Sequence, residues 1–170
     1  MSLSWNEFWT VLHGLVFGTV YLLAFTGGFE AFWSLGKETM TDSMLINKLK
    51  RLKWGTWTMA IMSWITVITG TYIVYVWYRA KVPTSPRSLL LANPDTALWH
   101  TFGMEWKEHV AWFAPILATV VAIIVTHYGI ELVKNNNIRK YIFILFCLAF
   151  FAAAVAGLFG AFINKVAPVL

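Results

Sequence analysis

Four long apolar stretches, at residues 8–33, 54–78, 110–133 and 141–163, alternate with short polar segments along the chain. A helix rises about 1.5 Å per residue, so each stretch is long enough to cross about 30 Å of hydrocarbon. The pattern predicts an all-α integral membrane protein built as a bundle of four transmembrane helices. Almost nothing is left over for a soluble domain, so we interpret residues 1–170 as a single membrane domain.

Two of the polar segments carry further structure. The segment TDSMLINKLKRLKW begins with a cap-like Thr41–Asp42, and its Met and Leu residues fall on one face while its basic residues point elsewhere. This is typical of an amphipathic helix in the membrane interface, here one that leads into span two. Between spans two and three, Pro83, Pro86 and Pro94 interrupt helix and predict a long outer loop, after which the chain becomes helical again.

Composition and charge agree with a membrane location. The chain is 59% hydrophobic and 12% charged, whereas soluble domains carry about 25% charged residues. The formal net charge is +5, but the basic residues lie at the ends of the spans, where they meet anionic lipid, so we expect no nucleic-acid partner. The single Cys147 has no partner in the chain and says nothing about the compartment.

The distribution of Lys and Arg predicts the orientation. The loops after spans one and three hold eight of these residues, whereas the N-terminus, the loop after span two and the tail hold five. Because basic loops stay in the cytoplasm, we expect both termini outside, in the cytoplasmic membrane of a bacterium or an archaeon.

Two histidines on parallel spans suggest a cofactor. His13 and His109 lie near the outer ends of spans one and three, at depths that differ by about 5 Å. Paired neutral imidazoles at one depth suit the two axial positions of a haem b. Glu105 lies four residues before His109, so its carboxylate could orient that imidazole.

Small residues beside His13 would give a flat cofactor room. Gly14 and Gly18 form a G-x-x-x-G pattern in span one, and span four carries Ala and Gly at every fourth position. The alternative is plain helix packing, for which G-x-x-x-G is the usual membrane device. For the imidazole, the corresponding alternative is that His13 binds no cofactor and is hydrogen-bonded to a neighbouring helix.

The other two histidines fit this pair poorly. His100 precedes His109 by nine residues and is half a turn out of phase on a straight helix. His127 shares the face of His109 but lies about 27 Å away, and no other histidine lies at its depth. We therefore expect one haem, and interpret His127 as a hydrogen-bonded residue near the helix end.

This arrangement resembles the four-helix membrane cytochrome b subunits of respiratory complexes. The resemblance covers the spans as architecture and depends on His13 and His109 for its motif. It implies a haem-b-binding electron-transfer subunit that passes electrons between a quinone and a periplasmic redox partner. The chain departs from the di-haem pattern, in which two helices each carry two histidines 13 to 14 residues apart, because span one has only His13.

Two alternatives remain open. His100, Met104, Glu105 and His109 could form a copper site at the outer surface, because thioether and imidazole ligands suit Cu(I). The chain could also be a non-catalytic structural or assembly subunit that contacts other membrane subunits or further copies of itself. The sequence shows no nucleophile–base pair, phosphate loop or Cys cluster, so we do not expect an enzyme acting alone.

Overall fold

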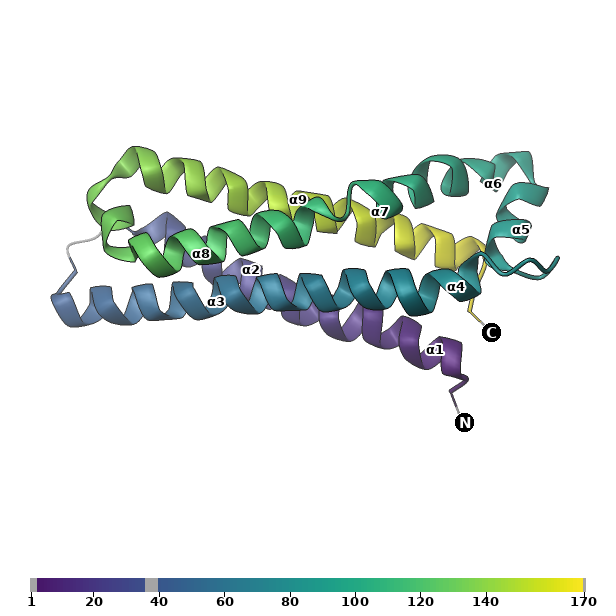
Figure 1. The fold of residues 1–170 in the computed structure, drawn as a ribbon, viewed down its shortest axis with the longest axis horizontal. Helices are drawn as coiled ribbons and strands as arrows, with labels where there is room; N and C mark the ends of the chain where they lie inside the picture. The colour runs from purple at the N-terminus through teal and green to yellow at the C-terminus, as the bar shows by residue number, and fades with distance from the viewer. Residues whose placement is uncertain (1–2, 36–39, 170) are drawn as a thin grey trace.

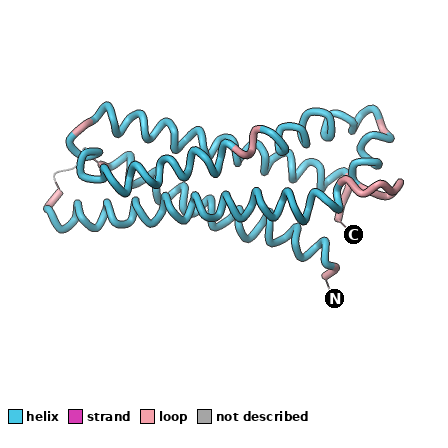
Figure 2. Tube along the Cα trace, viewed as in Figure 1, coloured by secondary structure: helices cyan, strands magenta, loops and turns pink. Residues whose placement is uncertain are grey.

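The computed structural model describes residues 3–35 and 40–169, which form helices and short turns without strands (Figures 1 and 2). It confirms an all-helical fold with four helices long and apolar enough to cross a membrane. These four spans are Trp5–Ser34, Asp42–Tyr78, Pro94–Lys134 and Asn136–Val166. Each is longer than the apolar stretch that predicted it, because polar residues continue the helix at its ends.

Three of the spans are composite. Span one consists of α1 (Trp5–Thr10), η1 (Val11–Val16) and α2 (Phe17–Ser34). Span two consists of α3 (Asp42–Thr69), η2 (Gly70–Val74) and α4 (Tyr75–Tyr78). After α5 (Pro86–Ala92), span three consists of α6 (Pro94–Leu98), η3 (Trp99–Met104), α7 (Glu105–His109) and α8 (Phe113–Lys134). Span four is a single helix, α9 (Asn136–Val166).

Polar side chains cap the helices where the sequence changes from turn to helix. Ser4 and Glu7 form a reciprocal capping box on α1, and the Thr41 hydroxyl accepts from the backbone N–H of Met44. The amide oxygens of Asn93 and Asn135 cap α6 and α9 in the same way. Such caps satisfy backbone N–H groups that have no partner inside the helix. The segment that starts at Thr41 leads directly into span two, as expected, because α3 runs from Asp42 to Thr69 without a break.

Span three is interrupted between α7 and α8 at residues 110–112. Pro115 explains the position of this turn, because proline has no N–H to donate to the carbonyl of Ala111, four residues earlier. That carbonyl instead accepts from the N–H of Ala114, at 3.1 Å. Because of this interruption, the side chains of α7 do not continue the helical register of α8.

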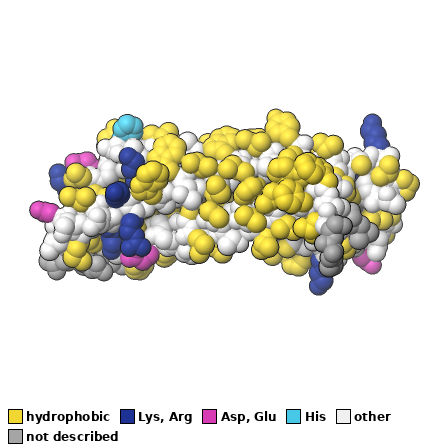
Figure 3. Space-filling model, turned by 90° about the horizontal axis from the view of Figure 1, so that it is seen from below, with side chains coloured by type: hydrophobic (Ala, Val, Ile, Leu, Met, Phe, Trp, Pro, Cys, Tyr) yellow, Lys and Arg dark blue, Asp and Glu magenta, His cyan; other side chains and the backbone are white. Residues whose placement is uncertain are grey.

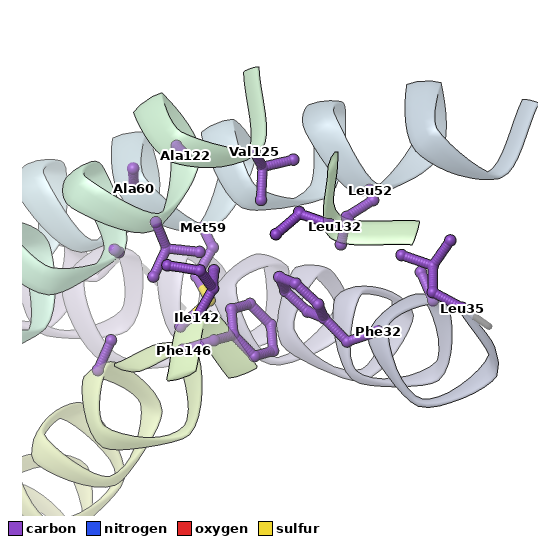
Figure 4. Close-up of a cluster of buried hydrophobic side chains, with 14 of the residues drawn as sticks. Phe32, Leu35, Leu52, Met59, Ala60, Ala122, Val125, Leu132, Ile142 and Phe146 are labelled. Atoms are coloured by element: carbon purple, nitrogen blue, oxygen red, sulfur yellow. The ribbon is translucent and has the colours of Figure 1, made fainter. Parts of the chain in front are cut away.

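The main apolar core lies in one half of the bundle (Figure 4). Phe146 of α9 is fully buried at its centre and stacks on Phe25, with 5.0 Å between the ring centroids. Gly28 of α2 makes room for this ring: a Cβ atom there would lie 2.7 Å from the Phe146 Cζ atom. A second, smaller cluster around Tyr78, Leu90 and Ile163 lies near the chain termini.

The two ends of the bundle differ from its middle. Both chain termini lie at one end, which we call the terminal end, and the turn between α8 and α9 lies at the other, which we call the loop end (Figure 1). On the face drawn in Figure 3, charged side chains gather at the two ends and apolar side chains cover the middle. This distribution is the one expected of a bundle with an apolar membrane zone.

Candidate functional site

The polar interior of the bundle lies in its terminal half. Three π-helical turns, η1, η2 and η3, occur there, one in each of the first three spans. They contain His13, Gly70 and His100 respectively. Because π-helical turns are rare and are found often at functional sites, this half is where we look for one.

His13 is held in one orientation by span two. Its Nδ1 atom lies 3.3 Å from the hydroxyl oxygen of Thr69. That hydroxyl donates its own hydrogen to the backbone carbonyl of Ile65 at 2.7 Å, so it accepts from the Nδ1–H of His13. The Thr66 carbonyl is a second acceptor beside the ring. In the tautomer with the hydrogen on Nδ1, Nε2 keeps its lone pair.

Gly70 provides the space for this imidazole. A Cβ atom at position 70 would lie 2.6 Å from the His13 Cε1 atom and 3.4 Å from Nε2. Any side chain at this position would displace the ring. Span two thus supplies both the hydrogen-bond acceptor and the space that orient His13, a combination that metal-binding histidines use to present one nitrogen.

Lys107 of α7 enters the same region from span three. Its ammonium donates to the backbone carbonyl of Ala156 in α9 at 3.1 Å and acts electrostatically on the His13 ring. Gly160 makes room for it, because a Cβ atom there would lie 2.8 Å from Nζ. His13, Thr69, Lys107 and Ala156 thus bring groups from all four spans to one polar region, which we call the His13 site.

His109 lies outside this site. Its side chain is 72% exposed, and its Nδ1–H donates to the backbone carbonyl of Glu105 at 2.9 Å. The Glu105 carboxylate is 3.7 Å from the same nitrogen, so the expected i,i+4 pair forms. Lys107, only two residues earlier, faces the interior, and the two side chains leave the helix in opposite directions. The structure therefore does not bring His109 and His13 together.

The remaining predicted residues are also placed apart. A Cβ atom at Gly14 or at Gly18 would meet no atom within 4 Å, so both glycines leave open space beside span one. Of the four residues suggested for copper, His100 and Met104 are buried, Glu105 contacts Arg79, and His109 points outward. Within residues 3–35 and 40–169, no three His, Cys, Asp or Glu side chains are placed to hold a metal ion.

His100 belongs to a separate buried contact. Its Nε2 atom accepts from Arg87 Nε at 3.3 Å, and its Nδ1 atom lies 2.9 Å from the Tyr78 hydroxyl. Because Nε2 is the acceptor, a neutral imidazole carries its hydrogen on Nδ1 and donates it to Tyr78. The ring thereby joins α5 to the ends of spans two and three, which is a structural role. His127 lies at the loop end, exposed beside Tyr128.

An ionic cluster joins the end of span two to α7 of span three. Arg79, the first residue after α4, donates to both carboxylate oxygens of Glu108 at 2.8 and 2.9 Å and to Glu105 at 3.3 Å. The Tyr75 hydroxyl donates to Glu108 at 3.1 Å, and the guanidinium lies over the Tyr75 ring. Burial opposes the charge of Arg79, but the hydrogen bond and the charge of Glu108 raise its pKa above the ordinary value.

Replacing Glu108 with alanine should destabilise the bundle by about 1–3 kcal/mol, because it removes both main contacts of a partly buried guanidinium. The side chains of Arg79 and Glu108 are 33% and 17% exposed. Unfolding of the detergent-solubilised protein by SDS, followed by circular dichroism, measures the change. Glu131→Ala is the matched control, because the Lys134–Glu131 pair is 67% and 54% exposed and should contribute under about 1 kcal/mol. Equal effects of the two substitutions would contradict the prediction.

Sequence reasoning misses several residues of this half. It counts Arg79 and Lys107 only as loop charges, and it gives no role to Thr69, Gly70 and Glu108. A usable signal exists, because ionisable residues beside or within apolar spans are functional candidates by default. For Thr69 and Gly70 the sequence offers little, since small polar residues also occur where membrane helices merely pack.

Three donor atoms in this half are buried without a hydrogen-bond partner among the described residues: Arg79 Nε and the indole Nε1 atoms of Trp9 and Trp106. Trp9 lies one helical turn before His13, and Trp106 precedes Lys107. Unpaired buried donors are costly, so acceptors at these positions would be stabilising.

Comparison with protein-family models, curated proteins and solved structures finds no match to this chain.

Proposed function

We propose that this chain is the haem-b-binding membrane subunit of a respiratory or other redox complex, with His13 as the residue that ligates the haem iron. The observation that carries the proposal is the position of His13: its Nδ1 atom lies 3.3 Å from the Thr69 hydroxyl, which itself donates to the Ile65 carbonyl. With its hydrogen on Nδ1, the imidazole would have Nε2 available to bind a metal. Axial histidines of haem proteins bind through one neutral nitrogen while the other is held by a hydrogen bond.

The residues around His13 fit a haem in part. Lys107 acts electrostatically on the His13 ring and supplies positive charge that suits anionic propionate groups. Gly14 and Gly18 leave space beside span one. His109 does not fit as the opposite axial ligand, because its side chain points away from the bundle. Among the described residues, His13 is the one that we propose would hold the haem iron.

A haem b would supply one-electron transfer between a quinone and a periplasmic redox partner. The chain's own residues orient the imidazole through Thr69 and Gly70, and Lys107 places a cation beside it. The apolar middle of the bundle would exclude water from the site. We further propose that the basic loop end is cytoplasmic and that both termini are outside, in a bacterial or archaeal cytoplasmic membrane.

A reduced-minus-oxidised absorption spectrum of the purified protein tests this function. We expect a Soret band and a reduced α-band in the wild type, and the loss of both in His13→Ala. His109→Ala is the matched control, because it removes an imidazole that is 72% exposed, and it should keep the spectrum. A wild type without these bands, or a His13→Ala variant that retains them, would overturn the proposal. Loss of the bands in both variants would restore His109 as the second ligand.

A non-catalytic subunit is the second candidate. The observation in its favour is that Gly14 and Gly18 have open space beside them, which leaves a small-residue face for a helix of another subunit or another copy. Gly14→Leu combined with Gly18→Leu should then disrupt the assembly without affecting the fold of the chain. Size-exclusion chromatography of the solubilised complex measures this effect. An unchanged elution volume would contradict the second candidate.

A further inference from the structure

A groove at the loop end of the bundle lies far from the His13 site. It has a volume of about 550 Å³ and runs between the start of α3 and the end of α8. Its size is within the range of about 300–1,000 Å³ that is typical of small-ligand sites. Its lining includes Lys50 and Lys53 of α3, and His127, Tyr128, Glu131 and Lys134 of α8.

The α3 wall of the groove has a regular spacing. Lys50, Lys53 and Trp57 follow one another at i, i+3 and i+7, which places them on one stripe of α3. On the α8 wall, His127 precedes the non-helical residue Tyr128, and Glu131 and Lys134 follow it. Between the two walls, Leu49 Cδ2 would lie 3.8 Å from a Cβ atom at Gly129, so the two helices are in close contact along the floor.

Two features hold this groove in shape. The Trp57 indole donates to the Thr126 hydroxyl at 2.9 Å and joins α3 to α8 on the side toward the middle of the bundle. The backbone of Tyr128 leaves the helical conformation, with φ −116° and ψ 20°, and interrupts α8 within its last two turns. The Tyr128 side chain is 58% exposed at the mouth of the groove.

The charge of the groove favours an anion. Lys134 has an ion-pair partner in Glu131, with 3.5 Å between Nζ and Oε1. For Lys50 and Lys53, both exposed, no ion pair is found in the part of the chain that the structure describes. Three lysines against one glutamate leave an excess of two positive charges over the groove, without counting His127.

The remaining lining residues indicate which kind of anion would fit the groove. Leu49, Val125 and Ile130 form an apolar part of the groove, and Ile130 is 60% exposed. Trp54 and Tyr128 are both exposed, with 64% and 58% of their surface accessible. Exposed aromatic residues of this kind are typical of a membrane–water boundary. A ligand that fits both parts has a phosphate head beside Lys50 and Lys53 and apolar chains that extend along α8. We propose that the groove binds one anionic glycerophospholipid through its phosphate.

Native mass spectrometry of the full chain in detergent, titrated with phosphatidylglycerol or with phosphatidylcholine of the same acyl chains, tests the proposal. We expect the wild type to prefer phosphatidylglycerol. Lys50→Gln combined with Lys53→Gln should weaken phosphatidylglycerol binding by about 10- to 30-fold, because each lysine near an anionic headgroup contributes about fivefold. Exposed lysines replaced by glutamine should leave the fold intact, which circular dichroism verifies.

Lys140→Gln combined with Lys165→Gln is the control, because it removes the same charge from exposed positions outside the groove. This variant should keep the wild-type preference. Equal binding of the two lipids by the wild type, or the same loss in both double variants, would overturn the proposal. An excess of inorganic phosphate should not displace the lipid, since the acyl chains contribute to binding. Displacement by phosphate would show a simple anion site and overturn the lipid assignment.

Discussion

Gly70→Leu should remove His13 from its position and abolish haem binding as completely as His13→Ala does. The reason is steric: even a Cβ atom at position 70 would lie 2.6 Å from the imidazole Cε1 atom, well inside van der Waals contact. A leucine adds three further carbons at the same place. The ring must then leave Thr69, and its Nδ1–H loses the acceptor that fixes the tautomer.

Two measurements check this prediction. The absorption spectrum should lose its Soret band, and histidine-selective ¹⁵N NMR should show that His13 no longer holds a protonated, hydrogen-bonded Nδ1. Gly157→Leu is the matched control, because Gly157 is exposed and a Cβ atom there would meet no atom within 4 Å. A Gly70→Leu variant with an unchanged His13 signal would contradict the described packing, whether or not the protein binds haem.

Phe146→Ala should lower the free energy of unfolding of the bundle by about 2–4 kcal/mol. Phe146 has no exposed surface, stacks on Phe25 and has its ring centroid 5.3 Å from that of Phe32. Lipid tails are as apolar as a phenyl ring, so most of the loss comes from van der Waals contacts around the cavity and little from transfer out of water. The ring also fills the space over Gly28, where α2 has no side chain of its own.

SDS unfolding followed by circular dichroism measures this change. Phe151→Ala is the control, because it removes the same ring from the same helix at a position that is 57% exposed, and its effect should be within about 1 kcal/mol of zero. Loss of stability of similar size in both variants would show that the effect comes from helix propensity or from lipid contact. Such a result would contradict the placement of Phe146 at the centre of the core.

The length of the apolar stretches was sufficient to predict four membrane-length helices. One helix start was also visible locally, since the cap-like Thr41 caps α3 through its own side chain. The continuation of α6 to α7 above the third apolar stretch followed from Asn93, Pro94 and Asp95. These features depend on neighbours within a few residues, and such neighbours are visible in a sequence.

Which polar side chains of different helices face one another could not be predicted in this way. By residue count, His13 and His109 lie at a similar depth on two parallel spans. In the structure, however, His109 points outward, and Lys107 of the same helix points inward. The π-helical turns and the break at residues 110–112 change the rotation of each helix by an amount that a count of 3.6 residues per turn does not include.

The sequence by itself therefore determined the fold class, the number of long apolar helices and the basic character of the loops, because hydrophobic length and local capping need no information about neighbouring helices. Only the tertiary structure decided that His13 lies against Thr69 and Gly70, that Gly160 makes room for Lys107, and that Arg79 pairs with Glu108. Each of these contacts joins residues from different spans. Their geometry depends on how the helices rotate and pack, which no single span encodes alone.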